Sequence, residues 1–114
     1  MAGLPLNNFK TITSVVNTVE QTVYTAPLGF KSVFLLAQIT NTGDNNEQVS
    51  FKFGRDGIET EIVSNFTIPP NDTLNLLTGK LVLETDDYIK VVGTDNNLNP
   101  NDLQFIASIL ETSA

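Results

Sequence analysis

Apolar and polar residues alternate one by one along several parts of this chain, and this pattern restricts the fold more than any other feature. In the segment 49–53 (VSFKF) every second side chain is apolar, as a strand with one buried face requires. The segment 58–66 repeats the pattern, with Glu59 and Glu61 on the face opposite its apolar residues. A period of two predicts strands, because an amphipathic helix needs apolar residues three and four positions apart.

The four residues Gly54-Arg55-Asp56-Gly57 separate these two segments. Asp-Gly between alternating segments is typical of a tight β-hairpin, because the turn needs residues that tolerate a positive φ angle. The sequence therefore predicts a hairpin around this turn.

Further strands are expected in segments that contain many β-branched residues and are bounded by turn-forming residues. These segments are 9–18, 22–25, 31–42, 73–77, 80–84, 88–93 and 103–112. Eight or nine short strands at this spacing predict an all-β fold, an antiparallel β-sandwich of the immunoglobulin-like or jelly-roll type. A chain of 114 residues suits a single domain. We expect that domain to span residues 9–114, after an extended N-terminal arm at residues 1–8.

Two expected strands break the alternation. The segments 32–39 (SVFLLAQI) and 103–110 (LQFIASIL) are apolar on both faces. Either loops of the same subunit cover the outer faces, or a neighbouring subunit does, since exposed apolar patches usually mark interaction sites. On the second interpretation, the subunit contacts are expected at Leu4, Leu6 and Phe9 near the N-terminus, Phe34 and Leu36 on one strand, and Ile106 and Leu110 on the other.

The chain lacks the residues that most classes of enzyme use for catalysis. The chain has no cysteine and no histidine, so thiolate chemistry, Ser-His arrangements and the commonest metal ligand are all missing. Glu59 with Glu61, or Asp86 with Asp87, would supply the two carboxylates of a glycoside hydrolase. A solvated strand face explains the first pair and a tight turn explains the second. We therefore expect no enzyme and no cofactor.

The Asn- and Asp-rich segment 95–102 has oxygen-bearing side chains that could bind a metal ion. Oxygen ligands at Asp95, Asn97 and Asn99 resemble the start of a calcium-binding EF-hand loop, but Pro100 stands where glycine is needed and Ile106 where the bidentate glutamate belongs. We expect no metal site there, but a loop whose side chains satisfy their own backbone; a weak calcium site in this loop is the alternative.

Charge and hydropathy exclude two further partners. The formal net charge is −7, and the six basic residues are scattered singly, whereas nucleic-acid binding needs clustered Lys and Arg. No apolar stretch approaches the roughly 20 residues that span a bilayer. The first ten residues, MAGLPLNNFK, lack the basic and apolar regions of a signal peptide. We expect a protein made in the cytoplasm that contacts neither nucleic acid nor membrane.

Two stretches carry a family resemblance. Residues 24–29 (YTAPLG) open a strand, and residues 79–84 (GKLVLE) follow a proline turn and precede an acidic turn. In outline, the segment 23–112 resembles small virion structural proteins of tailed bacteriophages. Leu28 departs from the pattern, which often has a smaller residue at that position. The resemblance implies a component of the virion that decorates or stabilises the capsid, or forms part of the tail or neck, and whose partners are other virion structural proteins.

Assembly proteins of this kind are usually symmetric, so we expect a homo-oligomer, with a trimer as the first expectation. One alternative is a carbohydrate- or receptor-binding module at a virion tip, which would need exposed Tyr24 or Tyr88 beside the segment 95–102. Another alternative is a hydrolase built on Glu59 and Glu61.

Overall fold

The computed structural model describes residues 7–95 and 102–113. Within these ranges the chain forms nine strands and no helix. The strands are β1 (Asn7–Val16), β2 (Gln21–Thr25), β3 (Phe30–Asn41), β4 (Glu47–Arg55), β5 (Ile58–Ile68), β6 (Asp72–Asn75), β7 (Leu81–Leu83), β8 (Tyr88–Gly93) and β9 (Leu103–Ser113). The predicted all-β class is confirmed. No helix in the described part of the chain is long and apolar enough to cross a membrane.

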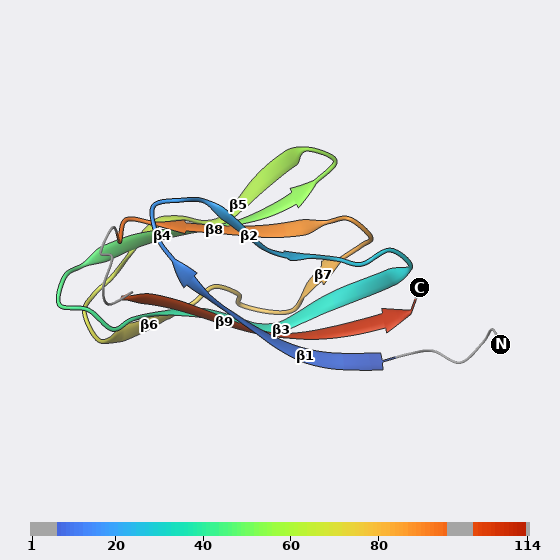
Figure 1. Cartoon of the computed structure of the whole chain (residues 1–114), viewed down its shortest axis with the longest axis horizontal. Helices are drawn as coiled ribbons and strands as arrows, with labels where there is room; N and C mark the ends of the chain where they lie inside the picture. The colour runs from blue at the N-terminus through green and yellow to red at the C-terminus, as the bar shows by residue number, and fades with distance from the viewer. Residues whose placement is uncertain (1–6, 96–101, 114) are drawn as a thin grey trace.

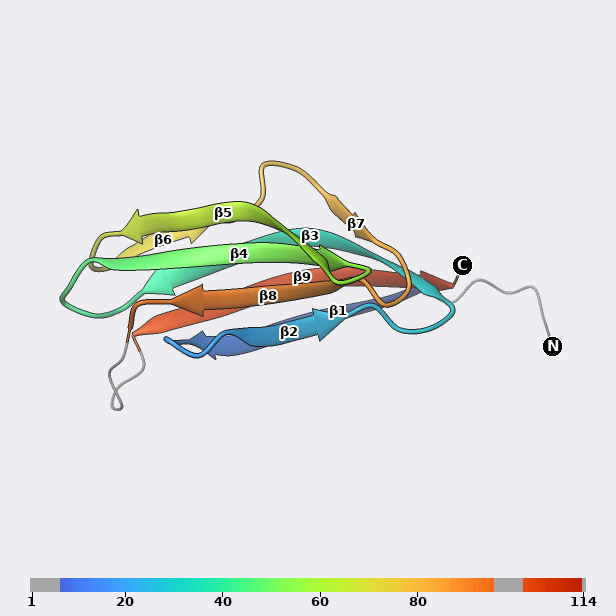
Figure 2. The ribbon, with the colours of Figure 1, turned by 90° about the horizontal axis from the view of Figure 1, so that it is seen from above.

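The strands form two sheets that lie on each other as two layers (Figures 1 and 2). The first sheet has the order β1-β9-β3-β6, and β7 pairs with the same edge of β3 as β6 does. The second sheet has the order β2-β8-β4-β5. Every pairing is antiparallel. In Figure 1 the first sheet is the lower layer and the second sheet the upper one.

The strand order distinguishes between the two sandwich types that the sequence left open. The strands β1 and β2 lie in different sheets, and the terminal strands β1 and β9 are neighbours. An immunoglobulin fold keeps its first two strands in one sheet, whereas this order is that of a double-sheet jelly roll. The short strands β6 and β7 share one position beside β3.

The predicted hairpin is confirmed. Arg55 at the end of β4 pairs with Ile58 at the start of β5, so only Asp56 and Gly57 form the loop. Both have positive φ angles, 54° and 79°, as a type I′ turn requires.

The core lies between the two sheets and consists of the inward side chains of the alternating strands. The ring of Phe51 packs on that of Phe105, with centroids 6.1 Å apart. The ring of Tyr24 meets that of Phe34 edge-on at 5.4 Å. All three phenylalanines are fully buried, so the aromatic residues of the core join both sheets.

Candidate functional site

The outer face of the first sheet is the candidate functional surface, and we call it the neutral face. In an antiparallel pair, residues directly opposite each other project to the same side, so the strand registers define which side chains face outward. The neutral face contains Asn7, Phe9, Thr11, Thr13, Val15, Lys31, Val33, Leu35, Leu36, Gln38, Thr40, Thr73, Asn75, Val82, Gln104, Ile106, Ser108, Leu110 and Thr112. Lys31 is the one charged residue in this set.

Four apolar residues form a row across the neutral face. Phe9 on β1 pairs with Leu110 on β9, Leu110 with Val33 on β3, and Val33 with Val82 on β7. Phe9 is 71% exposed and Val82 52% exposed, and the two residues between them are half-buried. Nothing in the described chain covers the ends of this apolar row.

A β-bulge in β3 adds two leucines to the neutral face. The pairing of β3 with β9 shifts by one residue between Phe34 and Leu36, because Leu35 has no partner of its own on β9. Leu35 and Leu36 are each 40% exposed, whereas strict alternation would bury one of them. The bulge therefore extends the apolar area beside the row.

The bulge also explains the error in one expected contact residue. The sequence placed Phe34 with Leu36 on the outer face of β3, but Phe34 is fully buried in the core. Residues 34 and 36 are two apart and share a face in a regular strand. The extra residue between them reverses this relation, so Phe34 points inward.

The other expected contact residues fall into two groups. Phe9, Leu36, Ile106 and Leu110 lie together on the neutral face. Leu4 and Leu6 lie outside the described residues, as do the first six positions of the expected arm.

The sequence does not predict three further apolar residues of the neutral face, Val33, Leu35 and Val82. Val33 and Val82 become part of the surface only through the pairing of β3 with β7. Leu35 becomes part of it only through the bulge. The order of residues along one strand predicts neither the pairing of β3 with β7 nor the bulge.

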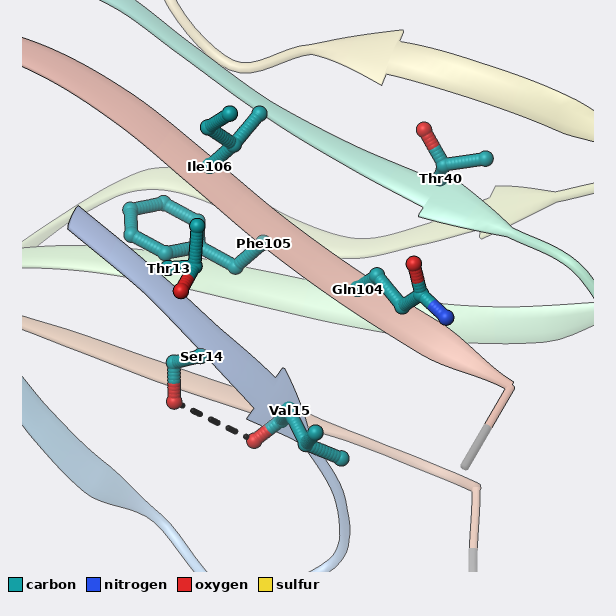
Figure 3. A pocket seen from close by; sticks show the side chains of 7 residues that line it. All are labelled: Thr13, Ser14, Val15, Thr40, Gln104, Phe105 and Ile106. Carbon is teal, nitrogen blue, oxygen red and sulfur yellow. Dashed lines mark hydrogen bonds between the residues drawn. The ribbon is translucent and has the colours of Figure 1, made fainter. Parts of the chain in front are cut away.

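Two shallow depressions lie on the neutral face. The larger, about 550 Å³, is lined by Thr13, Ser14, Val15, Thr40, Gln104, Phe105 and Ile106. Figure 3 shows these side chains along β1, β9 and β3. The smaller, about 360 Å³, lies beside Phe9, Thr11 and Leu35. The larger depression has no ionisable side chain in its described lining, so it suits packing by neutral side chains better than acid–base chemistry.

The outer face of the second sheet is charged, in contrast to the neutral face. The Lys90 Nζ lies 2.8 Å from a carboxylate oxygen of Glu59, and the Lys52 Nζ lies 2.7 Å from one of Glu20. Lys90 also lies 3.8 Å from Glu20. The Tyr88 hydroxyl donates a hydrogen bond to Glu59. We call this surface the charged face.

These ion pairs bear on the hydrolase alternative. The hydrogen bond from Lys90 is the main cause that lowers the pKa of Glu59 below its usual range. An acid catalyst of a glycosidase needs a raised pKa. The arrangement of Glu59 is therefore that of an ion-pairing residue.

The second carboxylate pair, Asp86 and Asp87, is also structural. Asp87 accepts hydrogen bonds from the Arg55 guanidinium at 2.6 and 2.9 Å and from the backbone N–H of Glu84 at 2.8 Å. Asp86 adopts a positive φ of 70° in the turn. Through Arg55, Asp87 holds the β7–β8 turn against the β4–β5 hairpin.

A buried polar cluster joins the two sheets near the end of β9. The Tyr24 hydroxyl donates a hydrogen bond to Glu111 and lies 2.7 Å from the Ser32 hydroxyl. Asn8 and Lys10 also donate to Glu111, at 3.3 and 3.4 Å. Burial and the hydrogen bond to Glu111 raise the pKa of Tyr24 above its usual range. Because Tyr24 is buried, it cannot serve the receptor-binding alternative.

Three carboxylates meet near the ends of β4, β8 and β9. One oxygen from each of Glu47, Asp95 and Asp102 lies within 4.8 Å of the others, and all three residues are buried. The Thr94 hydroxyl donates to Glu47, and the Asp102 backbone N–H donates to Asp95. The last bond agrees with the expected loop whose side chains satisfy its own backbone. Residues 96–101 of that loop lie outside the described residues.

No protein-family model matches the chain, and no curated protein sequence does. Several solved structures share the fold. A chain of the T13 viral particle of infectious bursal disease virus matches with a TM-score of 0.54 and 14% identity, over 94% of this chain and 31% of that chain. The VP2 subviral particle of the same virus matches with a TM-score of 0.52 and 12% identity, over 96% of this chain and 32% of that one.

A bacterial structure is similar over nearly its whole length. The Bacillus endospore appendage, described as disulfide-linked pili, matches with a TM-score of 0.58 and 11% identity, over 96% of this chain and 88% of that chain. The present chain thus spans about a third of the viral chains and most of the appendage chain. At these identities the matches show a common β-sandwich fold.

Proposed function

We propose that this protein is a non-enzymatic structural component of a tailed bacteriophage virion. In this role it decorates or stabilises the capsid, or forms part of the tail or neck, through contacts between subunits. Its partners are other virion structural proteins and further copies of itself.

The neutral face is the observation that carries this proposal. A sheet that covers the core with one side and faces water with the other usually alternates apolar and polar residues. Here the outward side holds an apolar row from Phe9 to Val82 and two leucines at the bulge. Exposed, contiguous apolar area of this kind marks an interaction surface on a soluble protein.

The fold and the resemblance support the same role. The similar solved structures come from a viral particle and from pili, both of which are assemblies of repeated subunits. The YTAPLG and GKLVLE stretches resemble virion proteins of tailed phages. The disulfide link described for the pili does not carry over, because this chain has no cysteine.

The proposal is tested by co-sedimentation of the purified chain with purified phage capsids and tails, together with light scattering of the chain alone. We expect saturable attachment to one type of particle, and a homo-oligomer in solution. The trimer expected from the sequence stays a prediction that the measured mass checks. A chain that attaches to neither capsids nor tails would refute the proposal.

Two substitutions assign the contact to the neutral face. Phe9→Glu places an acid on this face, and Ile58→Glu places one on the β4–β5 hairpin; the two parent side chains are 71% and 72% exposed. We expect Phe9→Glu to lose assembly and Ile58→Glu to keep it. Equal loss in both variants would mean that the neutral face is not the contact surface.

A further inference from the structure

We propose that the neutral face of one chain packs against the neutral face of a second copy, as a two-fold symmetric pair. This inference rests on the proposed structural function and names the occupant of its main contact surface. Four observations about charge, hydrogen bonding, size and symmetry lead to it.

The charge distribution favours a second copy. The chain has 13 acidic residues and a net charge of −7, so two copies repel each other over most of their surface. Among the described residues, no Asp or Glu projects from the neutral face. On the charged face, by contrast, contact between two copies would have to cover the carboxylates of Glu20 and Glu59.

The polar side chains of the neutral face are self-complementary. Apart from Lys31 they are Thr, Ser, Asn and Gln, such as Thr11, Gln38 and Ser108. Hydroxyl and amide groups both donate and accept hydrogen bonds, whereas a carboxylate only accepts and an ammonium only donates. A surface of such groups pairs with an identical surface without leaving like groups opposed.

The area is sufficient for a stable pair. Four strand positions and about ten residues per strand give a face of about 20 Å by about 33 Å, or roughly 650 Å². Standard protein interfaces bury about 600 to 1,000 Å² per partner. The apolar row crosses the full width of this face, from the edge strand β1 to the edge strand β7.

The symmetry follows from the use of a single surface. A two-fold contact uses the same patch on both subunits, whereas a closed trimer needs two different complementary patches. The neutral face is a single, self-complementary patch. The pair therefore departs from the trimer expected from the sequence. It also leaves a charged face pointing outward on each side, free to contact other virion proteins.

Light scattering of the parent chain and two variants tests the pair. We expect the parent to have twice the 12.4 kDa mass of one chain. Leu36→Glu should have the mass of one chain, because a pair would bury two added carboxylates. Ile58→Glu should keep the mass of the parent. A far-ultraviolet circular dichroism spectrum equal to that of the parent shows that each variant is folded.

Thiol labelling tests which face is covered. The chain has no cysteine, so a single introduced one is unique. Thr11→Cys lies on the neutral face and Thr22→Cys on the outer side of the second sheet, and both parent threonines are exposed. We expect a bulky maleimide to label Thr22→Cys at all protein concentrations, and Thr11→Cys only after dilution to monomers.

In light scattering, a monomeric or trimeric parent, or a Leu36→Glu variant with the same mass as the parent, would overturn the pair. In thiol labelling, Thr11→Cys that is labelled equally at all protein concentrations would overturn it. The proposed function fails separately. A monomer that attaches to capsids or tails, and loses this attachment in Leu36→Glu, removes the pair and keeps the function. A pair that attaches to neither capsids nor tails supports the two-fold contact and refutes the proposed function.

Discussion

At the scale of single residues, the buried polar cluster around Glu111 is the most demanding part of the core. The Glu111 carboxylate is almost fully buried, yet it accepts hydrogen bonds from Tyr24, Asn8 and Lys10. Buried charges persist in proteins only when they are paired in this way. The cluster therefore specifies how the second sheet lies on the first.

Tyr24→Phe should lower the free energy of unfolding by about 1–3 kcal/mol, because it removes a hydrogen-bond donor from a buried carboxylate. The ring, and with it the contact to Phe34, stays in place. Tyr88→Phe is the matched control, since the Tyr88 hydroxyl bonds to Glu59 at the surface. Urea unfolding monitored by circular dichroism measures both. Equal effects in the two variants would contradict the role of the cluster.

The stability should fall in acid because the two buried carboxyl groups of Asp87 and Glu111 have lowered pKa values in the folded state. The hydrogen bonds from Arg55 are the main cause for Asp87. For Glu111, burial alone would raise the pKa, but the hydrogen bonds from Tyr24 and Asn8 and the charge of Lys10 outweigh it.

The unfolded chain therefore binds more protons than the folded chain in acid. Both contributions are fully present above about pH 5 and are lost as the pH falls through about 4 and below. Urea midpoints measured from pH 7 to pH 3 check this. Asp87→Asn should show a shallower decline than the parent, and an identical decline would refute the assignment to Asp87.

At the scale of elements, local sequence predicted the strands well. The segment 88–93 forms β8 over the expected residues, and most other bounds differ by one or two positions. The hairpin turn was visible because Asp-Gly tolerates positive φ at both positions. Each of these features depends on neighbours along the chain.

Gly57→Ala should destabilise the protein by about 1 kcal/mol or more, because a side chain is strained at positive φ. Gly79→Ala is the control: a Cβ at either glycine meets no atom within 4 Å, but only Gly57 has a positive φ, 79°. We expect the control to change the free energy of unfolding by less than about 0.5 kcal/mol. Thermal unfolding of both variants separates backbone strain from crowding, and a larger loss in the control would contradict this account.

The bulge in β3 is an element that the local sequence did not reveal. The segment 32–39 is apolar on both faces, so one extra residue leaves its hydrophobic pattern unchanged. Only the pairing with β9 shows that Leu35 is the unpaired residue. For this reason Leu36 was correctly placed on the outer face and Phe34 was not.

At the scale of the whole molecule, the two outer faces differ in charge, and this difference predicts how association responds to salt. Contact through the neutral face brings together molecules of like net charge, so screening by salt should strengthen it. If the contact used the ion pairs of the charged face, added salt should weaken it.

We therefore expect the dissociation constant of self-association to decrease between 50 mM and 500 mM NaCl, as measured by sedimentation equilibrium. Phe9→Glu should remain monomeric at both salt concentrations. Association that weakens with salt would place the contact on the charged face and contradict the inferred pair.

The sequence by itself determined the fold class, the strands, the hairpin and the presence of two strands that are apolar on both faces. Each of these depends on the order of side chains along one strand, which a period of two records. Only the tertiary structure decided the jelly-roll order, the burial of Phe34 and the joining of Phe9, Leu110, Val33 and Val82 into one row. The physical reason is that strand pairing joins segments far apart in the chain, and alternation within a strand carries no information about its partner.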